Sequence, residues 1–139
     1  MPNSVLIDAS FLVTLSNLAD KNRAKALAFL QLNRDKRVIP EIVLAEAAHV
    51  IRYRIGQRAV LAFLDGLIQS EALLQPVSKA DLQRAREIMA QYAASDFDLA
   101  DCCIMALAER LQITQVCTFD QRDFRIFRPR HCPYLELLP

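Results

Sequence analysis

Glycine and tryptophan are scarce in this sequence, whose 139 residues contain two glycines and no tryptophan. So few glycines exclude the glycine-rich loops that cradle phosphate groups, and neither GxGxxG nor GKS or GKT occurs. The sequence also has no run of about eighteen apolar residues, and its N-terminus lacks the charged start and cleavage site of a signal peptide. We therefore expect a cytosolic protein without a membrane partner.

Cysteines are few, and none forms a CxxC pair. We expect Cys102, Cys103, Cys117 and Cys132 to be buried thiols in a reducing compartment rather than zinc ligands. Neither sign of charge is in excess, because 17 basic residues face 16 acidic ones and the net charge is +1. A role in binding nucleic acid must therefore rest on a local patch.

Short apolar runs alternate with segments of helical spacing, which is typical of an α/β protein. With 53% hydrophobic residues the chain can form one core, and we expect a single domain over residues 1–139. The patterns predict strands at 5–7, 38–39, 72–74 and 113–119, and helices at 9–19, 20–33, 41–53, 57–69, 79–92 and 99–111. The helices at 41–53 and 57–69 form a predicted hairpin, and the second is expected to bury Val60, Leu61, Leu64 and Ile68.

Asp101 is placed where packing alone would not put an acid. Ile104 and Met105 follow it by three and four positions, so its carboxylate points the way the apolar face of its helix points. We place it beyond the first turn, where the helix dipole does not account for it. A lone buried carboxylate is costly unless it is paired or binds a metal. The strand at 113–119 returns far enough to bring Asp120 back to the level of Asp101.

Asp8 and Glu46 occupy similar places. Asp8 ends the first strand, at the edge where open α/β sheets collect functional groups, although it or Ser10 could simply cap the next helix. Glu46 lies on the apolar face predicted for the helix at 41–53. His49 could pair with Glu46 on a metal, but a packed or partner-facing histidine is the favoured interpretation.

Asp98 has two open interpretations. With Ser95 it repeats the capping box formed by Ser78 and Asp81, so it either caps the helix at 99–111 or lies at the rim of a site.

The chain becomes basic after Asp120. Four arginines fall within nine residues: Arg122, Arg125, Arg128 and Arg130. Such a patch beside an acidic pocket would suit a phosphate-bearing polymer. A solvated surface anchored by Phe124 and Phe127 explains the same pattern equally well.

Four acids lie at strand ends or on apolar helix faces: Asp8, Glu46, Asp101 and Asp120. Carboxylates that converge in one pocket repel one another, and a hard divalent cation relieves this repulsion. Oxygen ligands without thiolates or convincing histidines favour Mg²⁺ or Mn²⁺. Water held by such an ion can attack phosphorus, which describes metal-assisted hydrolysis of a phosphodiester.

Nearly the whole chain resembles the PIN-domain ribonucleases, especially the VapC-type toxins of prokaryotic toxin-antitoxin operons. The likeness rests on the order and spacing of VLIDAS, IPEIVLAEAAHVI, DLADCCIMALAERL and CTFDQRDF. It implies a three-layer α/β/α sandwich with a mostly parallel central sheet and a metal-dependent endoribonuclease site that leaves 5′-phosphate and 3′-hydroxyl ends. By the same resemblance, the catalytic and metal-binding acids are Asp8, Glu46, Asp101 and Asp120. Further candidates are Ser10 and Thr118, as hydroxyl residues beside the first and last acids, together with Asp98 and Asp123.

The resemblance also implies a homodimer and a small antitoxin that inserts a segment near the hairpin and the active-site groove. We interpret Arg122, Arg125 and Arg128 as RNA-binding residues, for which the family supplies no fixed counterpart. The rival hypothesis is a PIN-like module that binds RNA or protein with little catalysis. A phosphatase or receiver-like domain is disfavoured, because no lysine lies beyond Lys79. The acids alone do not separate RNA from DNA as the substrate.

Overall fold

A sheet of five short strands runs through the centre of the molecule, and all of its neighbouring pairs are parallel. The computed structural model describes residue 1 and residues 3–139. The strands are β1 (Ser4–Ile7), β2 (Lys36–Pro40), β3 (Leu73–Gln75), β4 (Gln115–Cys117) and β5 (Glu136–Leu138), in the spatial order β3-β2-β1-β4-β5. The helices are α1 (Ala9–Ser16), α2 (Arg23–Leu32), α3 (Ile42–Arg54), α4 (Gln57–Gln69), α5 (Lys79–Gln91), α6 (Leu99–Leu111) and α7 (Arg122–Ile126), with a 3₁₀ turn η1 (Ala93–Ser95) before α6.

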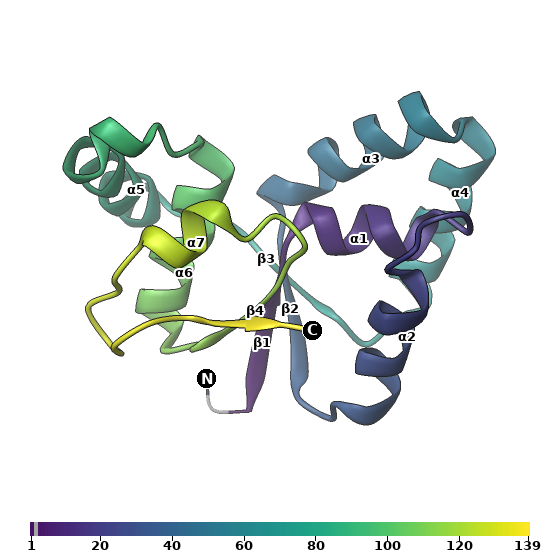
Figure 1. Ribbon diagram of the computed structural model, residues 1–139, viewed down its shortest axis with the longest axis horizontal. Coiled ribbons are helices and arrows are strands. Elements are labelled where there is room, and N and C mark those ends of the chain that lie inside the picture. The colour runs from purple at the N-terminus through teal and green to yellow at the C-terminus, as the bar shows by residue number, and fades with distance from the viewer. Residues whose placement is uncertain (2) are drawn as a thin grey trace.

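The helices form two layers around this sheet. Figure 1 shows α1–α4 on one side of the strands and α5–α7 on the other. The predicted three-layer α/β/α sandwich with a parallel central sheet is therefore confirmed. Within the described residues, no helix is both long and apolar enough to span a membrane.

The centre of the core is made by β1 and α6. All four residues of β1 are buried, because the strand lies in mid-sheet between two helical layers. Residues 101–108 of α6 are buried as well, because α3, α5 and α7 all contact this helix. The inner face predicted from Ile104 and Met105 is confirmed, and Leu111, which the same spacing places on this face, is partly buried against the core.

The cysteines are free thiols, as predicted. Cys102, Cys103 and Cys117 are buried, whereas Cys132 is only half-buried. Burial raises the pKa of Cys102 and of Cys117 to about 12, so both stay protonated at neutral pH. They contribute to packing.

The sheet departs from the prediction on one side. β4 covers three of the seven residues predicted at 113–119. β5, which was not predicted, pairs with β4 at the edge of the sheet. A three-residue strand is too short to give a recognisable alternation of apolar and polar residues.

Helix α4 has the predicted bounds, but only one edge of its predicted inner face packs against the core. Phe63 and Leu67 pack against the core. The predicted inner residues that remain exposed are Leu61, Leu64 and Ile68, and Ile68 is 79% exposed. The prediction was therefore correct for Val60, which also packs against the core, and wrong for the other three residues. The apolar stripe of α4 is wide, and only its edge with Val60, Phe63 and Leu67 faces the core.

Ion pairs fasten α5 to α6. Arg110 donates through Nε and Nη2 to the two carboxylate oxygens of Asp81, at 2.7 and 2.9 Å. The capping box predicted for Ser78 and Asp81 is present at the start of α5. Burial opposes ionisation of Asp81, but the hydrogen bonds from Arg110 and Ser78 outweigh it and lower the pKa of this carboxyl. These contacts fix the helix that carries Asp101.

Candidate active site

The carboxyl ends of β1 and β4 meet where the order of the sheet reverses. The next strand in the chain after β1 lies on one side of it, and β4 lies on the other. Ile7 pairs with Cys117, and the N–H of Asp8 donates to the carbonyl oxygen of Cys117 at 3.0 Å. Asp8 and Thr118 therefore emerge side by side at the edge where parallel sheets collect functional groups.

The Asp8 carboxylate is held by three hydrogen bonds. Its Oδ1 accepts the Ala9 N–H at 2.8 Å, so Asp8 caps α1. Its Oδ2 accepts from Thr118 Oγ1 at 2.8 Å and from Ser10 Oγ at 3.1 Å. Burial raises the pKa of Asp8, these hydrogen bonds oppose the rise, and the charge of Asp120 adds to it. The capping interpretation is therefore correct, and the capping carboxylate also lies among the other acids.

The two hydroxyl residues connect the start of α1 to the loop after β4. Ser10 Oγ accepts the N–H of Phe119 at 3.0 Å. Thr118 Oγ1 accepts the N–H of Asp120 at 3.0 Å. Both candidate hydroxyls thus lie beside Asp8, and together they fix the point at which Asp120 leaves the sheet.

Helix α6 begins with Asp98 as its N-cap. The Oδ1 of Asp98 accepts the Asp101 N–H at 2.8 Å. Its capping role is confirmed, but the predicted capping box with Ser95 is wrong, because Ser95 ends η1 and Asp96 then adopts a positive φ of 54°. Asp101 consequently lies in the first turn of α6. The prediction that placed it beyond that turn was wrong although the bounds of the helix were right, because Asp101 is only the third residue after the N-cap Asp98.

Asp101 is a buried acid among other acids, with 8% of its surface exposed. Burial, followed by the charges of Asp8 and Asp98 and by a hydrogen bond and charge from Asp123, raises the pKa of Asp101 to about 9. The favourable field at the start of the helix does not offset these effects. Asp101 is therefore protonated at neutral pH unless a cation takes the place of its proton.

Asp123 lies next to Asp101 and is also buried. It stands in the first turn of α7, where the sequence left its role open. Its Oδ1 accepts a hydrogen bond from Arg122 Nη1 at 2.7 Å, and Arg122 Nη2 donates to the Ser95 carbonyl oxygen, also at 2.7 Å. This connection between α7 and the turn before α6 has no signal in the sequence, because it joins residues far apart in the chain.

Glu46 and Asp120 are exposed, in contrast to Asp8 and Asp101. The buried residues of α3 are Val43, Ala47 and Ile51. The prediction that Glu46 lies on the buried face was therefore wrong: it stands one position to the side. Partial burial and the charges of Asp98, Asp8 and Asp120 nevertheless raise its pKa. Because Glu46 is exposed, we attribute the rise in its pKa mainly to the neighbouring negative charges. Glu46 therefore lies close enough to the other acids to feel their charge.

The acids share one electrostatic field without forming a closed metal shell. Within residues 1 and 3–139, no three His, Cys, Asp or Glu side chains are arranged to hold a metal ion as they stand. The donor chemistry nevertheless fits Mg²⁺ or Mn²⁺, since all the converging ligands are carboxylates and their repulsion is unrelieved. Glu46 and Asp120 are both exposed, so the packed core encloses neither of these two carboxylates.

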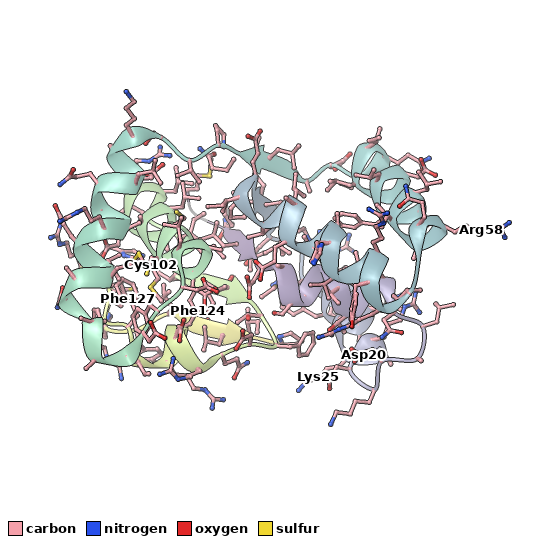
Figure 2. All side chains as sticks on the ribbon, turned by 90° about the horizontal axis from the view of Figure 1, so that it is seen from above. Asp20, Lys25, Arg58, Cys102, Phe124 and Phe127 are labelled. Atoms are coloured by element: carbon pink, nitrogen blue, oxygen red, sulfur yellow. The ribbon has the colours of Figure 1, made fainter. Side chains whose placement is uncertain are left out.

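The basic segment after Asp120 presents its arginines to solvent. Arg125 and Arg128 are exposed. Arg125 Nη2 donates to Gln121 Oε1 at 2.6 Å, and Arg128 Nη1 donates to the carbonyl oxygens of Arg125 at 2.7 Å and Phe127 at 3.0 Å. Phe124 and Phe127 are buried and anchor the segment, in the half of the molecule formed by α5–α7 (Figure 2). The anchoring interpretation is thus confirmed, while the exposed arginines leave a basic surface beside Asp123.

A large apolar pocket, which the sequence did not reveal, opens between α1, α2 and α4. Its volume is about 1310 Å³. Apolar lining residues include Phe11, Leu15, Leu30, Phe63 and Leu67, and the charged ones are Arg23, Arg34, Asp35, Lys36, Arg37 and Glu71. The hairpin of α3 and α4 contributes to one wall, and the basic residues outnumber the acidic ones.

Known proteins resemble this chain in sequence and in fold. The family model of the PIN domain matches residues 5–128. Ribonuclease VapC26 of Mycobacterium tuberculosis is 27% identical over 125 residues, which cover 90% of this chain and 93% of that protein.

Two crystal structures illustrate the likeness in fold. Mycobacterium tuberculosis VapC20, a sarcin-ricin loop cleaving toxin, matches with a TM-score of 0.84 at 18% identity, over 97% of this chain and 99% of its own. VapBC2 from Rickettsia felis, bound to a DNA fragment from its promoter, matches with a TM-score of 0.69 at 17% identity, over 96% of both chains.

Proposed function

This chain belongs to the PIN domain family, and we propose that it is a metal-dependent endoribonuclease that hydrolyses phosphodiester bonds of RNA in the cytoplasm, as the toxin of a toxin-antitoxin pair. The observation that carries the proposal is the convergence of two buried acids, Asp8 and Asp101, with Glu46 and Asp120 in the same field. Such a cluster is costly to fold without a cation.

Each acid has a distinct part in this proposal. Asp8, fixed by Thr118 and Ser10, is the rigid ligand, and Asp101 is the ligand whose proton a cation replaces. Glu46 and Asp120 are exposed, and they complete the site from the solvent side. Mg²⁺ or Mn²⁺, when bound, supplies a water of lowered pKa and stabilises charge that develops on the phosphate. The expected products carry 5′-phosphate and 3′-hydroxyl ends.

The RNA backbone is expected to lie along α7. Arg125 and Arg128 provide exposed positive charge in the segment that follows Asp120, and their guanidinium groups are not paired with any carboxylate in the described residues. Charge of this kind contacts phosphates irrespective of sequence. Arg122 is also predicted to share this role, although two of its three guanidinium nitrogens, Nη1 and Nη2, already donate to acceptors within the protein.

An antitoxin is the proposed partner protein. VapBC2 of Rickettsia felis and a toxin-antitoxin complex from Klebsiella pneumoniae, with a TM-score of 0.61, share this fold. The apolar pocket of about 1310 Å³ offers room for side chains of an inserted segment, and its basic rim favours an acidic flank on that segment. A homodimer is also expected, with the exposed apolar residues of α4 as surface for either contact.

The nuclease is tested on total cellular RNA, because a selective enzyme could ignore any single test RNA. Purified protein is incubated with Mg²⁺, Mn²⁺ or EDTA beside Asp101→Asn, and the new ends are sequenced. We expect cuts that need the metal and disappear in the variant. If the wild-type protein is folded and free of antitoxin but leaves all RNA intact, the proposed nuclease activity is refuted.

The partner site is tested by a matched pair of substitutions. Ala62 is exposed on α4 and lines the pocket, whereas Ala90 is exposed on α5 and does not. Ala62→Arg should prevent co-purification with the protein encoded beside the gene, and Ala90→Arg should not. Retention of the partner by Ala62→Arg would place the antitoxin elsewhere.

A binding module with little catalysis is the second candidate. It is favoured by one observation, that the described acids do not form a ready set of three metal ligands. In that case wild-type protein and Asp101→Asn would bind RNA equally, and neither would cut it.

A further inference from the structure

Arg122 connects α7, which carries the buried Asp123, to the turn before α6, the helix that carries the buried Asp101. Its Nη1 donates to Asp123 Oδ1 on α7, and its Nη2 donates to the carbonyl oxygen of Ser95, three residues before the N-cap Asp98. Asp123 in turn contacts Asp101. Both contacts of this one guanidinium therefore lead to the first turn of α6, one through the backbone and one through a carboxylate.

The surrounding fold has other supports that do not depend on Arg122. Tyr92 stacks on Phe97 with ring centroids 5.0 Å apart and packs edge-on against Phe127 at 5.9 Å. Its hydroxyl oxygen accepts the N–H of Arg128 at 3.0 Å. Because these contacts already hold α7 against the turn before α6, the guanidinium of Arg122 is not needed for the fold itself. Its side chain is 59% exposed, and exposed ion pairs contribute little to stability.

We propose that Arg122 is a positioning residue, which holds Asp123 against Asp101 and so sets the direction in which the Asp101 carboxyl group points. Without the guanidinium, Asp123 would stand as an uncompensated acid beside Asp101 and would turn towards water. Asp101 would then lose the contact that fixes its rotamer. The proposal rests on the proposed function, because the direction of Asp101 matters for RNA cleavage only if Asp101 belongs to the active site.

Kinetics of matched variants separate positioning from RNA binding. Arg122→Gln and Arg122→Lys are compared with Arg58→Gln, whose arginine projects from α4 at the far end of the molecule (Figure 2). The substrate is an RNA that the wild-type protein cuts with Mg²⁺. We expect kcat of Arg122→Gln to fall about tenfold, as for loss of one hydrogen bond to a charged group, with KM changed less than about twofold. Arg122→Lys should be intermediate, because an ammonium group lacks the two-pronged geometry.

A second background tests whether Arg122 acts through its neighbour. In Asp123→Asn, adding Arg122→Gln should cause no further loss of kcat, since the residue through which it acts is already changed. A rise in KM at unchanged kcat would instead make Arg122 a phosphate contact. Equal effects of Arg122→Gln and Arg58→Gln would remove Arg122 from the site.

Crystal structures supply a readout that needs no activity. In Arg122→Gln we expect the side chains of Asp123 and Asp101 to have separated and changed rotamer, while Asp8 and the hydroxyls that hold it keep their places. Unchanged Asp101 and Asp123 would overturn the positioning role. Failure of the wild-type protein to cut RNA would refute the proposed function alone, because the comparison of structures would still decide the role of Arg122.

Discussion

Replacing Asp101 with asparagine should stabilise the metal-free protein at neutral pH. The pKa of Asp101 is about 9 in the folded protein, against an ordinary value of 3.8. An aspartate with a raised pKa binds its proton more tightly in the folded state, so stability is lost as the pH rises from about 4 towards 9. Asparagine has nearly the same shape and can still donate to Asp123, but it carries no charge.

The size of the effect follows from this interval. The ordinary pKa of 3.8 lies about three units below pH 7. At about 1.36 kcal/mol per unit, this difference corresponds to a loss of roughly 4 kcal/mol in the free energy of unfolding at pH 7. This value is an upper limit, because Asp101 and the acids around it titrate together and share the bound proton. We expect Asp101→Asn to exceed wild type by about 1–4 kcal/mol in free energy of unfolding at pH 7.

Urea unfolding in EDTA measures the difference at pH 4.5 and at pH 7. The gap between Asp101→Asn and wild type should be small at pH 4.5 and large at pH 7. Asp65→Asn is the matched control, because Asp65 is an exposed aspartate on α4. If Asp101→Asn were no more stable than wild type at pH 7, the carboxylate would not be destabilised in the folded protein, and the case for a cation there would fail.

Three further variants test separate parts of the structure. Glu46→Gln should weaken Mn²⁺ affinity measured by calorimetry, and an unchanged affinity would remove Glu46 from the metal site. Arg125 and Arg128 are changed together to glutamine, and RNA affinity is measured at several salt concentrations. The slope of log affinity for single-stranded RNA against log salt concentration should become shallower by about 1.4, at about 0.7 for each lost phosphate contact. An unchanged slope would mean that neither arginine contacts RNA. Arg110→Ala leaves the buried Asp81 without its two-pronged partner and should cost about 1–2 kcal/mol in urea unfolding, because Arg110 itself is partly exposed. A cost below about 0.5 kcal/mol would mean that the capping box alone satisfies Asp81.

Patterns local to one element were the predictable part of the fold. The predicted bounds of α4 and α6 were correct. Asp8 was correctly placed at the end of a buried strand, because a short apolar run that is followed by an acid and a helical pattern is typical of a strand that leads into a helix. The pairing of Ile7 with Cys117 then brings Thr118 to Asp8, as expected of parallel strands whose carboxyl ends share an edge.

The errors concern features that depend on tertiary neighbours. Glu46 lies beside the buried face of α3 rather than on it, because Ala47 takes the inner position, and alanine gives a weak apolar signal. The burial of Asp123 and its connection through Arg122 to Ser95 depend on contacts between segments 27 residues apart in the chain. Periodicity and caps carry no information about such contacts, so a sequence places the acids near one another without showing which groups hold them.

Binding of Mn²⁺ to the purified protein tests most directly whether these carboxylates converge on a cation. Affinity is measured by calorimetry at pH 7 for wild type, Asp8→Asn, Asp101→Asn and the control Asp65→Asn. We predict that wild type and the control bind alike, and that each site variant binds at least about tenfold more weakly, a loss of about 1.4 kcal/mol. Equal affinity in all four proteins, or no binding by wild type, would contradict a metal site at Asp8 and Asp101.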